Sequence, residues 1–289
     1  MTQLPLLQRT CSSYKKTTLT KRYFQLTKIC LASLLLTTSL TTVSTAAQTA
    51  NKAKNAAIYS QLATQHPVWA EQGMVASQEA LATEIGVDIL KQGGNAIDAA
   101  VAVGYALAVT LPRAGNLGGG GFMMVYLAKE KKAIAIDYRE VAPLKSSRDM
   151  FLDDEGNADS QLSRFHGLAI GVPGTVMGFE LALQKYGSMS LKQVMAPAIK
   201  LAQQGITVTP DLANSLGATK KRLSRHASSL DIFYKADGSN YQPGDTLIQA
   251  DLAKTLTAIA NKGSKAFYQG PIAKAISQTV KNAGGIMTE

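Results

Sequence analysis

Hydrophobic residues recur with helical spacing early in the chain. Leucine and isoleucine stand at every fourth position within residues 79–92, which predicts an amphipathic helix that a glycine pair ends. Asn95 is a suitable N-cap for a second helix that runs to about Thr110. Because this second helix is apolar on nearly every side, we expect it at the centre of the core.

Strand patterns flank these two helices. A short apolar segment at residues 73–77 predicts a buried strand in front of them. Behind them, a run of glycines at 118–121 leads into residues 122–127 and 133–138, two apolar stretches joined by a charged turn, which predict a β-hairpin. A glycine run before a strand permits either positive φ angles or close backbone packing beside a site.

The second half of the chain is mostly helical. An acidic stretch at 153–157 predicts a solvated turn, because the spaced ligands of a calcium-binding loop are missing. Beyond it, apolar spacing predicts helices over residues 175–186, 191–204, 211–225, 251–262 and 271–283.

The charge of the chain is unevenly distributed. The net charge is +10, but six lysines and arginines precede residue 48 and the first acidic residue is Glu71, which leaves +4 for the rest. No later stretch interleaves basic clusters with aromatic residues as single-strand binders do, so we do not expect nucleic-acid binding. Lys220, Lys221 and Arg222 are expected to form a solvated helix face.

The amino end has the order of a secretory signal. Residues 29–40 are apolar, follow basic residues and precede small residues around Ala46 and Ala47. The apolar run is shorter than the ~20 residues that span a bilayer, so we expect residues 1–47 to be a cleaved signal peptide; an uncleaved signal anchor is the alternative. Either way the folded part is exported, to the periplasm or the medium, and with cleavage we expect no stable membrane span. Residues 48–71 are expected to be a flexible lead into residues 72–289.

Residue types that carry common chemistry are scarce in the exported part. Cys11 and Cys30 both lie in the leader, so the mature protein is expected to lack disulfides, which suits a bacterial periplasm. His66, His166 and His226 are scattered without zinc-ligand spacing, and we expect them to be surface or hydrogen-bonded residues. The sequence contains no G-x-S-x-G, and the glycine run matches neither nucleotide-loop pattern. We predict no metal and no cofactor.

Arg139 is the most informative charged residue. It follows the second strand of the predicted hairpin and lies close in sequence to the glycine run. A guanidinium at the end of a rigid strand can clamp a carboxylate through two parallel hydrogen bonds. The alternative, which the residues alone favour, is an ion pair with Asp137, Glu140 or Asp149.

Several motifs in this order resemble the gamma-glutamyltransferases, also called gamma-glutamyltranspeptidases or glutathione hydrolases. The resemblance runs from about Gln72 to the last residue. The segments that carry it are Gly-Met-Val-Ala-Ser at 73–77, residues 86–102, Gly-Asn-Leu-Gly-Gly-Gly-Gly-Phe at 115–122, Asp-Tyr-Arg-Glu-Val-Ala-Pro at 137–143, Gly-Val-Pro-Gly-Thr at 171–175 and the glycine pair at 284–285.

The resemblance implies an N-terminal nucleophile (Ntn) hydrolase fold, an α+β four-layer αββα sandwich that is incomplete in this chain. It also implies that residues 72–289 are the front of a large subunit, cut from a precursor that cleaves itself. In the family, the arginine of the Arg-Glu-x-Ala-Pro motif binds the α-carboxylate of the gamma-glutamyl group. The matching residue here is Arg139, so the resemblance favours the clamp over the ion pair.

The family's reaction is acyl transfer from glutathione and related compounds to water, amino acids or peptides. Its nucleophile is a threonine at the new amino end of the small subunit, and a glycine pair there supplies the oxyanion donors. Neither the Thr-Thr-His cleavage segment nor that oxyanion glycine pair occurs here, so no residue of this chain is predicted to be catalytic. We expect a fragment or truncated product that is inactive alone and whose partner is the missing part of its precursor. The alternatives are a non-catalytic binding protein for anionic ligands and a related acylase, such as a cephalosporin acylase.

Overall fold

A computed structural model describes residues 69–289. The predicted signal peptide at 1–47 and almost all of the segment at 48–71 lie outside these residues. Residues 70–289 form one unit. Its main helices and strands, in chain order, are α2 (Ala80–Lys91), α3 (Ala96–Thr110), β1 (Phe122–Leu127), β2 (Lys132–Asp137), α4 (Ser160–Phe165), α5 (Thr175–Tyr186), α6 (Leu191–Gln204), β3 (Ile206–Thr207), α7 (Pro210–Leu223), α8 (Ala227–Phe233), β4 (Thr246–Leu247), α9 (Ala250–Lys262), α10 (Lys265–Tyr268) and α11 (Pro271–Asn282).

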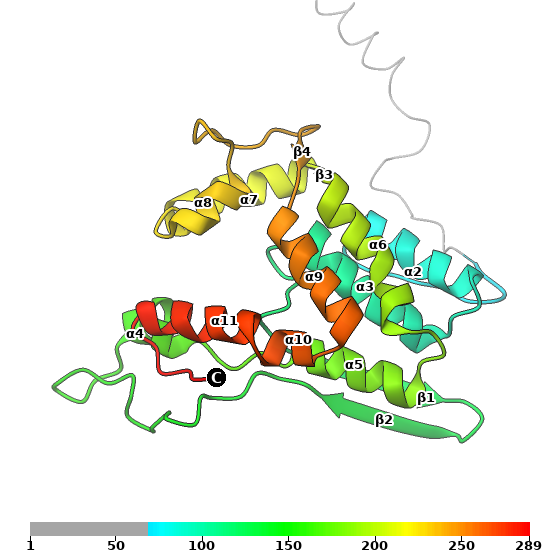
Figure 1. The fold of residues 1–289 in the computed structure, drawn as a ribbon, viewed down its shortest axis with the longest axis horizontal. Helices are drawn as coiled ribbons and strands as arrows, with labels where there is room; N and C mark the ends of the chain where they lie inside the picture. Colours follow the sequence, from blue (N-terminus) through cyan, green and yellow to red (C-terminus); the bar gives the residue numbers. More distant parts are fainter. Residues whose placement is uncertain (1–68) are drawn as a thin grey trace, which may run out of the picture. The chain divides into compact units, whose positions relative to one another are not determined.

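Helix α3 is the centre of the core, as predicted. Ten of its fifteen residues are buried, and it packs against α2, α5 and α6 (Figure 1). The side chain of Asn95 accepts hydrogen bonds from the backbone N–H groups of Ile97 and Asp98, at 2.8 and 3.1 Å. The helix therefore begins at the expected N-cap, which satisfies two of its unpaired amide groups.

Asp98 joins the start of α3 to the loop between α5 and α6. Its fully buried carboxylate accepts hydrogen bonds from the backbone of Asn95, from the backbone and hydroxyl of Ser188, and from the backbone of Met189, at 2.6 to 3.1 Å. Burial alone raises the pKa of Asp98, but the bonds from Ser188, Asn95 and Met189 outweigh it and hold the pKa below its ordinary value. Asp98 is therefore ionised inside the core, and hydrogen bonds satisfy its carboxylate.

The predicted hairpin is present. Strands β1 and β2 pair antiparallel, with Phe122 opposite Asp137 and Leu127 opposite Lys132, and β2 lies against α5 (Figure 1). One face of the ribbon buries Val125 and Ile136. The other face presents alternate residues of β1 that are about two-thirds exposed: Phe122 at 64%, Met124 at 71% and Tyr126 at 66%.

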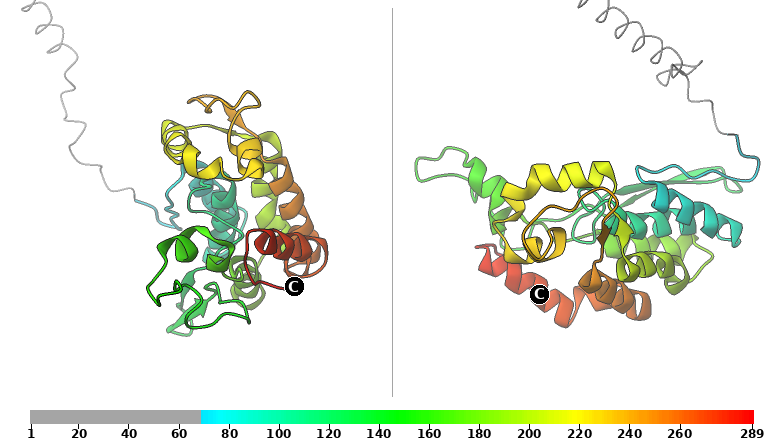
Figure 2. Two further views of the ribbon diagram at one scale, coloured as in Figure 1. Left: turned by 90° about the vertical axis from the view of Figure 1, so that its left-hand side faces the viewer. Right: turned by 90° about the horizontal axis from the view of Figure 1, so that it is seen from above.

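The helices predicted for the second half are present within two residues at each end. Helix α6 packs against both α3 and α9. The short β3–β4 pair joins the segment before α7 to the segment before α9. The sequence did not predict α4, α8 and α10, which have six, seven and four residues. Helices this short show too little periodicity to be recognised. Figure 2 shows α7 and α8, in yellow, standing away from β1 and β2.

The strand predicted at residues 73–77 is wrong. This segment has no assigned secondary structure and forms no ladder with any strand within 69–289. Met74 is 57% exposed, whereas Val75 lies over α2, where a Cβ atom on Gly86 would come within 2.7 Å of the Val75 Cγ1. The apolar residues therefore contact a helix, and no neighbouring backbone supplies hydrogen bonds.

Across the described residues, no helix combines the length and the apolar character needed to cross a membrane.

Replacing Asp98 with alanine is expected to lower the free energy of unfolding by about 3 kcal/mol, because four donor groups lose a charged acceptor in the core. Urea unfolding of the full chain measures this change. Asp88→Ala is the matched control, since Asp88 has a 62% exposed side chain that pairs only with Lys91; its effect is expected below ~1 kcal/mol.

The same pair of variants has an expected pH dependence. The pKa of Asp98 is lowered by folding, so its contribution is complete above the unfolded aspartate pKa of about 3.9 and is lost as the pH falls through the lower folded value. The stability difference between the unsubstituted chain and Asp98→Ala should therefore shrink below about pH 4. A difference that stays constant down to pH 2 would contradict the assigned ionisation.

Candidate functional site

The glycine run connects the hairpin to the start of α5. Gly121 and Tyr138 exchange backbone hydrogen bonds at 3.3 and 3.0 Å, which extends the β1–β2 ladder by one pair. The carbonyl of Gly119 accepts from the backbone N–H groups of Gly174 and Thr175, at 2.7 and 3.0 Å. Three segments far apart in sequence thus meet at the end of β2.

The glycines at this meeting point leave room for backbone. A Cβ atom on Gly120 would lie 2.7 Å from the backbone nitrogen of Glu140, and one on Gly174 would lie 2.7 Å from the carbonyl carbon of Tyr138. The ring of Tyr138 occupies the space that a side chain on Gly178 would need. None of the glycines at 118–121 has a positive φ, so left-handed backbone does not explain the run; close approach of backbone explains Gly120, whereas Gly118 has open space around it.

Arg139 follows directly on this closely packed backbone at the end of β2. Its backbone N–H donates to the Asp137 carboxylate at 3.0 Å, and its Nε donates to the Glu140 carboxylate at 2.9 Å. The guanidinium carbon lies 5.7 Å from the centre of the Phe122 ring. Of the ion pairs that the sequence left open, the one with Glu140 is present, whereas Asp149 pairs with Arg148 at 3.6 Å.

Both members of this pair are charged at neutral pH. The hydrogen bond and charge of Glu140 raise the pKa of the Arg139 guanidinium above its ordinary value. In return, the hydrogen bond from Arg139 lowers the pKa of the Glu140 carboxyl. The Arg139 side chain is 57% exposed, so solvent screens the attraction and the pair orients the side chain more than it stabilises the fold.

The Arg139–Glu140 contact leaves part of the guanidinium available. In the described part of the chain, the only hydrogen bond of the guanidinium passes through Nε, so Nη1 and Nη2 have no protein acceptor there. These two nitrogens can donate in parallel to the two oxygens of a carboxylate. The ion pair and the clamp, which the sequence presented as alternatives, are therefore compatible.

A cavity of about 420 Å³ lies beside the glycine loop. Arg139 does not line it, but its neighbour Tyr138 does, as does Phe122, over which the guanidinium lies. Its other walls come from the middle of α3, the glycine loop and the start of α5. Arg139 therefore lies next to a hollow whose shape depends on the glycine loop.

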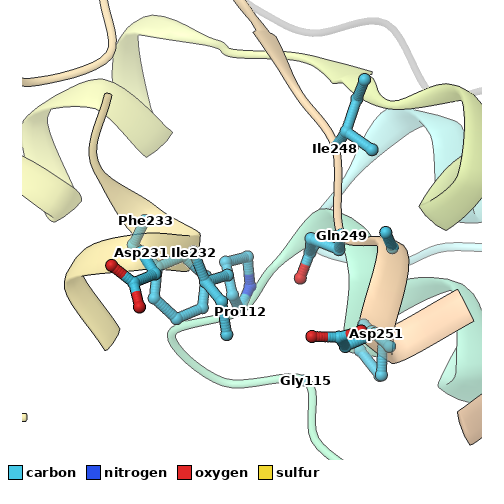
Figure 3. Close-up of a pocket in the computed structure, with 11 residues that line it drawn as sticks. Pro112, Gly115, Asp231, Ile232, Phe233, Ile248, Gln249 and Asp251 are labelled. Carbon is cyan, nitrogen blue, oxygen red and sulfur yellow. The ribbon is translucent and has the colours of Figure 1, made fainter. Parts of the chain in front are cut away.

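A second cavity, of about 460 Å³, lies between α8 and the start of α9 (Figure 3). Figure 3 shows the oxygen-bearing side chains of Asp231, Gln249 and Asp251 around it, with Pro112 and Ile232 among the apolar walls. None of its lining residues is a lysine or arginine. The chemistry of its walls therefore does not suit an anionic group.

The acidic turn and His166 have local structural roles, whereas His226 is a surface residue. Asp153 accepts from the backbone N–H groups of Glu155 and Asn157 at 3.1 and 2.7 Å, which confirms the predicted turn at 153–157. His166 accepts from the backbone of Leu168 at 3.3 Å, and His226 is an exposed residue at the start of α8. His66 lies outside the described residues.

The sequence did not assign a role to three polar residues that support the site. The hydroxyl of Thr175 donates to the side chain of Asn116 at 3.2 Å, which ties the glycine loop to α5. The hydroxyl of Tyr268 donates to the carbonyl of Pro173 at 2.8 Å and so supports the same turn from α10. Asn116 and Thr175 each adjoin a glycine in a recognised motif, which was a usable signal; Tyr268 had none.

Comparison with known proteins places these features in one family. The family model described as Gamma-glutamyltranspeptidase matches residues 82–289. The glutathione hydrolase proenzyme of Escherichia coli K12 is 56% identical over 225 residues, which are 78% of this chain and 38% of that protein. The chain thus spans less than two-fifths of the length of this relative.

Solved structures agree with the sequence match. The gamma-glutamyltranspeptidase of Helicobacter pylori is similar with a TM-score of 0.75 at 48% identity, covering 77% of this chain and 64% of that one. A cephalosporin acylase of Bacillus halodurans has a TM-score of 0.62 at 28% identity, covering 80% of this chain and 44% of that one. The described residues therefore share their fold with gamma-glutamyltranspeptidases and related acylases.

Gly174→Ala is expected to destabilise the chain by about 1–3 kcal/mol, because its Cβ would press on the backbone of Tyr138. Gly118→Ala, in the same loop system, is the control: no atom lies within 4 Å of its added Cβ, so a change within ~0.5 kcal/mol is expected. Urea unfolding measures both. Equal effects of the two substitutions would show that close approach does not explain these glycines.

Proposed function

The chain belongs to the gamma-glutamyltranspeptidase family, and on that basis we propose that it forms the front of the large subunit of an enzyme that transfers gamma-glutamyl groups. The donors are glutathione and other gamma-glutamyl compounds, and the acceptors are water, amino acids or peptides. The chain supplies substrate binding, and the reacting threonine comes from the remaining part of the precursor. That part is its principal partner.

In this proposal, Arg139 binds the α-carboxylate of the gamma-glutamyl group. The observation that supports it is the guanidinium that Glu140 holds through Nε, 57% exposed, on a backbone fixed by the glycine loop. Nη1 and Nη2 would donate to the two carboxylate oxygens. The backbone that the glycine loop fixes would limit how far the bound group can shift. Such fixed placement lowers the entropic cost of bringing substrate and nucleophile together.

The chemistry that this binding would serve is acyl transfer in two steps. The threonine hydroxyl attacks the gamma-amide carbonyl, its own α-amine takes the proton, and the amine product leaves with a proton, so that a gamma-glutamyl ester remains. Water or an acceptor amine then attacks the ester, which releases glutamate or a new gamma-glutamyl amide and restores the hydroxyl. Arg139 contributes position and charge balance, and it takes no part in bond breaking.

We further propose that the unit forms part of a four-layer αββα sandwich. The outward face of β1, with Phe122, Met124 and Tyr126, is apolar and largely exposed, and a sheet normally buries such a face against another layer. The remaining part of the precursor would provide that layer.

The division of the chain into a signal peptide at 1–47, a flexible lead at 48–71 and the subunit portion at 72–289 also remains a proposal. With it goes export to the periplasm or the medium. Sequencing the amino end of the secreted protein tests this division, and a start near residue 48 is the expected result.

A related acylase is the second candidate, since the Bacillus halodurans cephalosporin acylase shares the fold at 28% identity. The higher identity to glutathione hydrolases favours glutathione as the substrate. Parallel assays with glutathione and a glutaryl substrate separate the two. Release of glutarate without release of glutamate would favour the acylase.

Arg139→Ala is expected to raise the KM for glutathione about 30-fold or more, because the substrate carboxylate loses its charged partner. The assay uses a hybrid in which the aligned 225 residues of this chain replace the matching part of the Escherichia coli proenzyme. Arg139→Lys keeps the charge but not the two-pronged geometry, so an intermediate KM is expected.

Arg148→Ala is the matched control, because Arg148 has a 96% exposed side chain close in sequence to Arg139. Its kinetics should equal those of the unsubstituted hybrid. If Arg139→Ala and Arg148→Ala behaved alike, Arg139 would be only an ion-pair partner of Glu140.

A further inference from the structure

A hollow of about 330 Å³ lies between the end of α4 and the carboxyl-terminal half of α7. It shares no lining residue with the cavity beside the glycine loop or with the cavity at α8 and α9. Three of the six residues around it are basic. The six are Phe165, Ala218, Thr219, Lys221, Arg222 and Arg225.

These three basic residues repel one another. Lys221 and Arg222 lie in the last turn of α7 and Arg225 lies just beyond its end, so three like charges line one small hollow. Within residues 69–289, no carboxylate forms an ion pair with any of them. The hollow is therefore positively charged and uncompensated by the described protein.

Aromatic stacking holds one of the guanidinium groups in place. Arg225 lies over the ring of Phe165 at 5.3 Å from its centre, and Arg164 lies at 5.4 Å from the same ring. Phe165 is 44% exposed, so it presents its ring to the hollow instead of to a core. A stacked guanidinium keeps its edge directed outward, where it can donate to a planar or tetrahedral oxyanion.

Of the residues at 220–222 that were expected to form a solvated helix face, Lys221 and Arg222 are exposed as expected, whereas Lys220 is half-buried. Lys220 donates to the carbonyl of Gly238 and lies 5.2 Å from the ring of Tyr234, so it is directed to a different contact. The helix dipole favours Lys221 and Arg222 in the last turn of α7. It does not explain why Arg225, beyond the helix, stacks on an aromatic residue of α4.

We propose that this hollow binds a phosphate group carrying two negative charges. Three cations in one small hollow are balanced better by a dianion than by a single carboxylate, and arginine forks match phosphate oxygens in geometry. The phosphate can belong to a small soluble molecule or to a lipid headgroup. This site is separate from the proposed gamma-glutamyl site and does not depend on it.

Calorimetric titration of the full chain with inorganic pyrophosphate at low salt tests the proposal. Saturable binding is expected, and the double variant Arg222→Gln/Arg225→Gln should weaken it about tenfold or more. The double variant Arg222→Lys/Arg225→Lys keeps the charge and loses the forks, so a smaller loss is expected. Circular dichroism checks that each variant retains its helices.

The control is Arg148→Gln/Lys192→Gln, which removes the same charge from exposed positions outside the hollow. It should bind pyrophosphate within about twofold of the unsubstituted chain. Equal losses in the control and in Arg222→Gln/Arg225→Gln, or the absence of saturable binding, would overturn the proposal. The same titration of the hybrid precursor, whose activity reports its folding, separates loss of the site from loss of the fold.

Sedimentation with phosphatidic acid vesicles, compared with phosphatidylcholine vesicles, distinguishes the two sources of phosphate. Binding to phosphatidic acid that is lost in Arg222→Gln/Arg225→Gln assigns the site to a lipid headgroup. Binding to pyrophosphate alone assigns it to a small soluble molecule.

Discussion

The close approach of three backbone segments at the end of β2 is the constraint on which the candidate site depends. The loop at 118–121, the residues Tyr138 and Arg139, and the turn before α5 contact one another without intervening side chains. The backbone N–H groups of Gly174 and Thr175 donate to the carbonyl of Gly119, at 2.7 and 3.0 Å, and hold the segments together. Because these groups are fixed by main-chain geometry, Arg139 starts from a well-defined position even though its side chain is exposed. A loop with ordinary side chains could not bring the hairpin and α5 so close.

Two carboxylates show how burial and exposure determine what a charge in this chain can contact. Asp98 is fully buried and receives five hydrogen bonds, so all of its charge is used within the fold. Glu140 is partly exposed and receives one side-chain bond, from Nε of Arg139, which orients the guanidinium without occupying its outer edge. Burial thus fixes the first charge permanently, whereas exposure leaves the second able to share its partner with a bound group.

Much of this architecture could be predicted from the sequence because the signals were local. The N-cap at Asn95, the apolar period of α3 and the alternation in the hairpin each determine structure within about fifteen residues. The strand at 73–77 was predicted wrongly because an apolar run does not reveal whether a partner strand lies beside it. The sequence left the contact between Glu140 and Arg139 open. It gave no sign of the hydrogen bond from Tyr268 to Pro173, because these two residues are 95 positions apart. The resemblance favoured a clamp at Arg139 where the residues alone favoured an ion pair; the structure contains the pair with Glu140, and the clamp stays a prediction.

The two basic sites differ in what balances their charge, and this difference bears on what each can bind. At Arg139 a neighbouring carboxylate already compensates the guanidinium, so a ligand there gains mainly from geometry and must present two oxygens in one plane. At the hollow beside Phe165 three cations lack any such partner among the described residues, so a ligand there gains mainly from charge. Salt weakens the Coulomb attraction between exposed charges more than it weakens a bidentate hydrogen bond that depends on geometry. Rising ionic strength should therefore weaken ligand binding at the hollow more steeply than at Arg139, which makes salt dependence a property that separates the two sites within one molecule.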